Sequence, residues 1–142
     1  MYSGQVIKSL ISRFEFQSLP KSEWTHEAHL VVAIWYCWHN NYDEALDKVR
    51  LLILKYNEAV GIPNTDTEGY HESLTRFWLM NAYQFLHEHS CESIASAVND
   101  FILSPRGARS YPLNYYTRDL LFSVEARHNW VYPDLKSMDP FA

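Results

Sequence analysis

Four segments in which apolar residues recur every three or four positions constrain the fold most strongly. That spacing places apolar side chains along one face of an α-helix, where neighbouring helices can bury them. Ser22 or Thr25 can cap the first helix, Asp43 the second and Ser90 the fourth, while Gly61 and Pro105 are typical of helix ends. The predicted helices cover 25–38, 43–60, 67–89 and 90–104. We therefore expect an all-α fold, an up-down helical bundle of four main helices.

The two ends of the chain are less regular than its centre. Residues 5–13 can form a helix, while the alternation at 14–16 resembles a short strand. After the fourth helix, 117–122 and 123–128 read as short helical turns, and Pro133 opens an irregular tail. With 142 residues and no internal repeat or linker, we expect residues 1–142 to form a single helical domain.

Charge and composition exclude several classes of partner. The formal net charge is −5 and no basic cluster is present, which disfavours nucleic acids and membrane surfaces. The longest apolar run, 30–38, is too short to span a bilayer, and the N-terminal residues lack a signal-peptide core. Two cysteines cannot form a disulfide framework. We expect a cytoplasmic protein, and the sequence leaves its oligomeric state open.

Three histidines are the main candidates for a functional site. If consecutive helices run antiparallel, the first and third predicted helices begin at the same end of the bundle. His26 and His29 lie at the start of the first helix, and His71 lies at the start of the third. The topology is therefore expected to bring three imidazoles together from two distant parts of the sequence.

A mononuclear metal centre is the first interpretation of these histidines. Imidazoles three positions apart share a helical face, and their nitrogens are common ligands of divalent ions such as Zn²⁺. Ligation by His26, His29 and His71 would leave a fourth position open, as in catalytic sites. The ion could be Zn, Fe or Ni, and Glu72 and Thr75 could carry protons beside it. Alternatively, each histidine is a buried or capping residue with a structural hydrogen bond.

A small anionic ligand is suggested by the loop that follows the fourth predicted helix. Arg106 and Arg109 could clamp a carboxylate or phosphate through paired guanidinium hydrogen bonds, and Tyr111 could form a wall of the pocket. Alternatively, the two arginines pair with some of the seventeen acidic residues of the chain.

Several strings of the sequence resemble a known family. They are W-T-H-x-x-H-L at 24–30, G-Y-H-x-S-x-T at 69–75, and the segment 121–127 followed by P-D-L at 133–135. Together they resemble a family of small, uncharacterised, bacterial, all-helical proteins with no established activity. The three histidines are also similar to those of metal-binding helical bundles with the DinB-like fold, although the H-x-x-H spacing departs from theirs. The resemblance implies a helical fold and no particular reaction.

Three functions are compatible with these patterns. The first is a metal-dependent hydrolase or isomerase that acts on a small anionic substrate through metal-bound water. The second is a metal-free pocket in which the same histidines and an arginine bind a small ligand, with one histidine as base or hydrogen-bond donor. The third is an interaction module that binds a partner helix through surface aromatic residues. The sequence does not decide whether the protein is an enzyme.

Overall fold

The chain folds into a bundle of α-helices, described here by a computed structural model of residues 1–138. The helices are α1 (Gly4–Glu15), α2 (His26–His39), α3 (Tyr42–Ala59), α4 (Glu72–Glu88), α5 (Ile94–Leu103), α6 (Arg118–Leu121) and α7 (Val124–His128). Short 3-10 helices lie at Lys21–Glu23, Pro105–Gly107 and Tyr111–Asn114. No strand occurs in the part of the chain that the structure describes. The prediction of an all-α fold is confirmed.

The N-terminal segment is a fifth substantial helix rather than a helix followed by a strand. Its buried residues Ile7, Leu10, Ile11 and Phe14 follow helical spacing and face the core. Phe16 lies just beyond the helix and is exposed. The alternation at 14–16 was therefore a misleading strand signal, because Phe14 continues the apolar face of α1.

Side-chain caps fix where the main helices begin. The Thr25 hydroxyl accepts a hydrogen bond from the backbone of α2, as predicted. Asn41, rather than Asp43, caps α3, and Ser93, rather than Ser90, caps α5 together with Ser96. The predicted caps were two or three positions off, because several short polar residues in each connection can act as caps.

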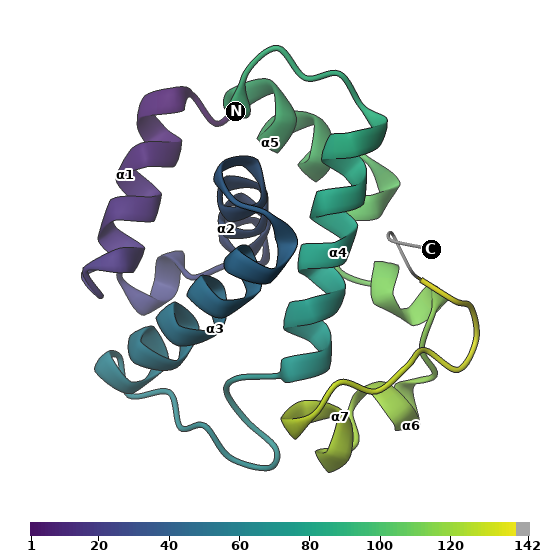
Figure 1. Cartoon of the computed structure of the whole chain (residues 1–142). Helices are drawn as coiled ribbons and strands as arrows, with labels where there is room; N and C mark the ends of the chain where they lie inside the picture. The colour runs from purple at the N-terminus through teal and green to yellow at the C-terminus, as the bar shows by residue number, and fades with distance from the viewer. Residues whose placement is uncertain (139–142) are drawn as a thin grey trace.

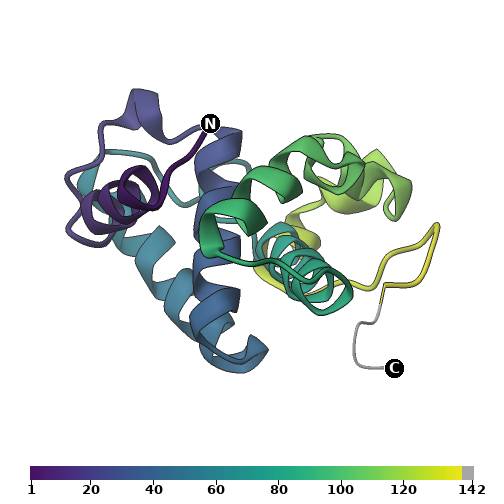
Figure 2. The same ribbon diagram turned by 90° about the horizontal axis from the view of Figure 1, so that it is seen from above.

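Helix α2 forms the centre of the bundle. It contacts α1, α3, α4 and α5, and most of its side chains are buried. Figure 1 shows α2 nearly end-on between α1 and α4, whereas Figure 2 shows α2 upright and α4 end-on. The two helices therefore cross, and α3 returns beside α2 at an angle. None of the helices within residues 1–138 combines the length and apolarity needed to cross a membrane.

The chain after α5 packs against α4 on the side away from α1 (Figure 1). A second apolar cluster joins Phe77 of α4 to Tyr115, Tyr116 and Leu121. The hydroxyl of Ser73 donates to the Asn129 carbonyl at 2.7 Å, which fixes the segment after α7 on α4. This arrangement places α6 and the residues before it opposite the N-terminal part of α2.

Candidate functional site

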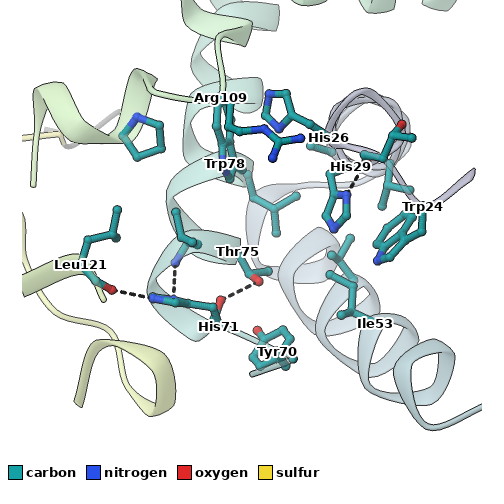
Figure 3. A pocket seen from close by; sticks show the side chains of 18 of the residues that line it. Trp24, His26, His29, Ile53, Tyr70, His71, Thr75, Trp78, Arg109 and Leu121 are labelled. Atoms are coloured by element: carbon teal, nitrogen blue, oxygen red, sulfur yellow. Dashed lines mark hydrogen bonds between the residues drawn. The ribbon is translucent and has the colours of Figure 1, made fainter. Parts of the chain in front are cut away.

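A cavity of about 910 Å³ lies between α2, α3, α4 and the segment 109–122. Apolar side chains such as Ile53 and Leu74 form most of its wall, together with the indole rings of Trp24 and Trp78. All three candidate histidines line it, which Figure 3 shows. The predicted convergence of His26, His29 and His71 on one region is therefore observed at the level of a shared cavity.

His71 has both ring nitrogens engaged by the backbone. As the N-cap of α4, its Nδ1 accepts a hydrogen bond from the Leu74 amide at 3.0 Å. Its Nε2 lies 2.6 Å from the carbonyl oxygen of Leu121 and must donate, because a carbonyl can only accept. Burial lowers the pKa of His71, which favours the neutral ring that this pair of bonds requires. His71 thus joins the start of α4 to α6.

His29 is the histidine with a nitrogen left for a ligand. Its Nδ1 donates to the Thr25 carbonyl at 2.6 Å, and its ring stacks on Trp24 with 3.8 Å between ring centres. No partner of Nε2 is found within residues 1–138, and the ring reaches into the cavity between Trp24 and Thr75 (Figure 3). This nitrogen therefore presents a lone pair to whatever occupies the cavity.

The surroundings of His29 keep its ring neutral. The ring lies against Trp24 at the cavity wall, and His29 as a whole is exposed through the open cavity. Desolvation lowers the pKa of His29 to about 4, and the charges of His26 and Arg109 act in the same direction. The result at neutral pH is an uncharged hydrogen-bond acceptor or base.

His26 is anchored to the loop that follows α5. Its Nε2 donates to the Gly107 carbonyl at 2.8 Å, and its ring meets the edge of Trp78. This bond leaves Nδ1 as the nitrogen without a backbone partner among the described residues. His26 and His29 therefore differ in the nitrogen that each could offer to a ligand.

The three histidines do not form a ready ligand set for a metal ion. Among residues 1–138, no group of three or more histidine, cysteine, aspartate or glutamate side chains is placed to hold one. His71 would have to give up a backbone hydrogen bond before either of its nitrogens could coordinate. Metal binding by His26, His29 and His71 stays a prediction. The two hydrogen bonds of the His71 ring favour a structural role for that residue.

Glu72 lies outside the cavity wall and is fully engaged. Its carboxylate accepts hydrogen bonds from Arg50 at 2.6 and 3.0 Å and from the Tyr70 hydroxyl at 2.6 Å. Burial opposes its ionisation, but these bonds and the charges of Arg50 and Arg76 outweigh burial and hold the pKa of Glu72 below its usual value. Glu72 thus connects α3 to α4 as a carboxylate held by Arg50 and Tyr70, which does not suit a proton carrier.

Thr75 does line the cavity, but its hydroxyl proton is already used. The Thr75 hydroxyl donates to the backbone carbonyl of His71 at 2.8 Å, one turn earlier in α4. Such a back-bonded hydroxyl still offers lone pairs to a ligand. Thr75 is therefore placed to accept a hydrogen bond rather than to deliver a proton.

Arg109 is the one residue of the predicted anion clamp that reaches the cavity. Arg106 instead donates to Asn81, Gln84 and Glu88 along α4 and lies outside the cavity wall. The hydroxyl of Tyr111 pairs with that of Tyr115 at 3.0 Å beside Phe77, also away from the cavity. The sequence could not separate the two arginines, because the acceptors of Arg106 lie about twenty residues earlier in the chain.

Arg118 completes the charged part of the site and was missed at the sequence level. Both Arg109 and Arg118 line the cavity, and neither forms a hydrogen bond through its guanidinium, or an ion pair, within the described residues. Figure 3 shows the Arg109 guanidinium directed toward His26 and His29. The residues next to Arg118 in the sequence do not indicate a site, because its position at the cavity depends on the turns between 105 and 117.

The charge of the cavity is opposite to that of the molecule. No aspartate or glutamate is found among the described residues that line it, whereas the chain as a whole carries a formal charge of −5. Arg109 and Arg118 are exposed residues without a paired acid within residues 1–138, and together they give this mainly apolar cavity a positive potential that attracts anions. The site can bind a negatively charged molecule that also has an apolar body.

Comparison with known proteins adds no further constraint. No protein-family model matches the chain, and no curated protein or solved structure matches it either. The resemblance to a bacterial all-helical family therefore stays a prediction, and the function has to be argued from the cavity itself.

Proposed function

We propose that the protein binds a small organic anion with an aromatic or otherwise apolar body in the cavity between α2, α3 and α4. The observation that carries this proposal is the presence of Arg109 and Arg118 at a cavity without acidic residues among its described lining. A guanidinium group without a protein partner can give its full set of donors to a carboxylate or phosphate.

The walls of the cavity support an apolar body for this anion. The indole ring of Trp78 offers a large surface that can pack against a flat ligand, and Trp24, which already stacks on Phe14 and His29, adds an apolar border to the cavity. A volume of about 910 Å³ falls within the usual range for sites that bind small molecules. The charged end of the ligand would lie at the arginines and its apolar end along these rings.

This proposal corresponds to the metal-free alternative of the sequence analysis. It needs no metal ligands, and it uses the free nitrogen of His29 and the unpaired Arg109 in the roles that their contacts allow. A metal-dependent hydrolase or isomerase and an interaction module both stay predictions, since neither is supported by a group of contacts in residues 1–138.

Binding of matched aromatic probes tests the proposal. Benzoate, 1-naphthoate and phenyl phosphate would be compared with benzamide and 1-naphthamide, using calorimetry and the fluorescence of the tryptophans. We expect the anions to bind more tightly than the neutral amides. Because hydrogen bonds to charged groups contribute about 1.5–3 kcal/mol, Arg109→Gln should weaken the anions by roughly tenfold or more.

Arg13→Gln is the matched control, because it removes the same charge from a half-buried arginine that pairs with Glu23 outside the cavity. It should leave the affinity for anions unchanged, and neither variant should alter binding of the amides. The proposal is overturned if none of the three anions binds, or if Arg13→Gln weakens them as much as Arg109→Gln does.

A further inference from the structure

His29 offers the cavity a hydrogen-bond acceptor of fixed direction. The bond from Nδ1 to the Thr25 carbonyl sets the tautomer, so that Nε2 carries the lone pair. Stacking on Trp24 holds the plane of the ring. In Figure 3 the ring extends from α2 into the space bordered by Thr75 and Ile53. A ligand in the cavity therefore meets a preoriented acceptor.

The acceptor of His29 and the donors of the arginines make opposite demands on a ligand. Arg109 and Arg118 can only donate hydrogen bonds and prefer an anionic group. The neutral ring of His29 can accept a hydrogen bond at Nε2 but cannot donate one there. A simple carboxylate or phosphate satisfies the arginines and leaves Nε2 unmatched. A ligand with a second, donating group satisfies both.

We propose that the cavity selects an aromatic acid that also carries a hydroxyl group, with its anionic group on Arg109 or Arg118 and its hydroxyl donating to His29 Nε2. This inference rests on the proposed function, because it assigns the second polar group of the same ligand. It makes His29 a residue that determines specificity, and it requires no proton transfer.

Desolvation gives the selection its strength. In the empty cavity, water can donate to His29 Nε2, since the ring is accessible. A ligand that fills the cavity displaces this water, and His29 Nε2 then lacks a hydrogen bond unless the ligand donates one in its place. A site built around such a group rejects analogues that lack the donor more strongly than a site that only excludes them by size.

Pairs of ligands that differ only in the donor test this selection. We would measure the affinities of 3-hydroxybenzoate, 4-hydroxybenzoate and 6-hydroxy-2-naphthoate against their methoxy counterparts, which accept but cannot donate. In the unmodified protein at least one hydroxy acid should bind about tenfold more tightly than its methoxy partner, the ratio expected for one hydrogen bond.

Variants at position 29 identify the acceptor. His29→Phe keeps a flat ring for Trp24 and removes the lone pair, so the ratio of the affinity for each hydroxy acid to that for its methoxy partner should fall toward one. His29→Leu removes the acceptor in a second way and serves if the phenylalanine variant does not fold, as judged by circular dichroism. His29→Gln, whose amide oxygen can accept, should retain part of the preference.

The outcomes separate this inference from the proposed function. If benzoate binds in an Arg109-dependent way but no hydroxy acid is favoured by more than twofold, the selection by His29 is overturned and anion binding stands. A preference for the hydroxy acids that persists in His29→Phe and His29→Leu also overturns the selection by His29, because another residue would then accept the hydrogen bond from the hydroxyl. If no aromatic anion binds at all, both proposals fail.

Discussion

The three histidines of the cavity differ in the ring nitrogen that remains available. His71 has none, His29 has Nε2, and His26 has Nδ1, because each ring already serves a backbone group. At the residue scale, the same amino acid is therefore a structural cap in one position and a candidate contact for a ligand in another. The backbone partner of each ring decides between these roles.

Substitution of His71 should destabilise the fold. His71→Ala removes the cap of α4 and leaves the Leu121 carbonyl without its donor. Loss of the cap costs about 1 kcal/mol and an unsatisfied buried carbonyl about 1–3 kcal/mol, so we expect a loss of about 2–4 kcal/mol in the free energy of unfolding. His71→Asn can still cap and should lose about 1 kcal/mol less. Urea unfolding of the two variants measures both effects.

Elemental analysis of the same proteins, purified without an affinity tag, addresses the predicted metal centre. One equivalent of a divalent ion that disappears in His71→Asn would support ligation by His26, His29 and His71. The hydrogen bonds of His71 lead us to expect instead that metal content does not differ between the unmodified protein and His71→Asn. An equal metal content combined with lower stability would assign His71 to the fold alone.

Acidification should destabilise the protein through His29. Its pKa in the folded protein, about 4, lies below the ordinary value of 6.5, so the unfolded chain binds more protons between these values. The free energy of unfolding should therefore fall as the pH decreases from about 6.5 toward 4, and stay at its plateau above that range. His71, whose pKa is also lowered, acts in the same direction.

Urea unfolding at pH 7.5, 6.0 and 5.0 measures this dependence in the unmodified protein and in His29→Phe. The variant lacks the ring that titrates. It retains His26 and Arg109, the two residues that lower the pKa of His29 electrostatically in the unmodified protein. We expect a shallower decline with acid in the variant. Equal slopes would show that His29 does not have a lowered pKa in the folded state.

At the scale of elements, the connection between α3 and α4 fixes one border of the cavity. Gly61 and Gly69 lie near its two ends, both with positive φ, and Gly69 contributes to the cavity wall. Arg127 donates to the carbonyl of Gly69 at 3.0 Å, so this connection is also tied to α7. The loop is therefore held by a backbone conformation and by a contact from the C-terminal part of the chain.

Alanine at the two glycines should have unequal effects. Both positions impose the left-handed conformation, which costs an ordinary residue about 1–2 kcal/mol. A Cβ at Gly61 would meet nothing, whereas a Cβ at Gly69 would lie 2.3 Å from the Pro63 carbonyl oxygen. Gly69→Ala should therefore lower the thermal midpoint clearly more than Gly61→Ala. Similar midpoints for the two variants would indicate that the loop can rearrange around Gly69.

At the scale of the whole molecule, two apolar clusters meet on α4. Phe77 belongs to the cluster that holds the segment after α5, and the next residue, Trp78, packs against both clusters. The cavity lies where the segment after α5 adjoins the rest of the bundle. Arg118 comes from that segment and His29 from α2. The site therefore depends on the docking of the C-terminal third onto the bundle.

Because both apolar clusters include residues of α4, we expect a single cooperative unfolding transition, as a single domain would show. Circular dichroism of the helices and tryptophan fluorescence should give the same midpoint in urea. Tyr116→Ala, in the second cluster, should lower that common midpoint, because removal of a buried aromatic side chain costs about 3–5 kcal/mol. Two separate transitions would contradict the single helical domain predicted for residues 1–142.

The sequence by itself determined the helices and the local part of the site. Apolar spacing of three or four residues reports a helical face wherever the helix finally packs, so the main helices were predictable and their ends were uncertain by a few residues. The pairing of His26 and His29 on the first turn of α2 follows from the same local geometry.

Only the tertiary structure decided which of these side chains are available for a ligand. The partner of His71 lies fifty residues away at Leu121, Arg106 is occupied by acceptors on α4, and Arg118 reaches the cavity through the turns before it. The physical reason is that helical periodicity depends on near neighbours along the chain. Hydrogen-bond satisfaction and charge pairing depend instead on groups that meet only when the helices cross.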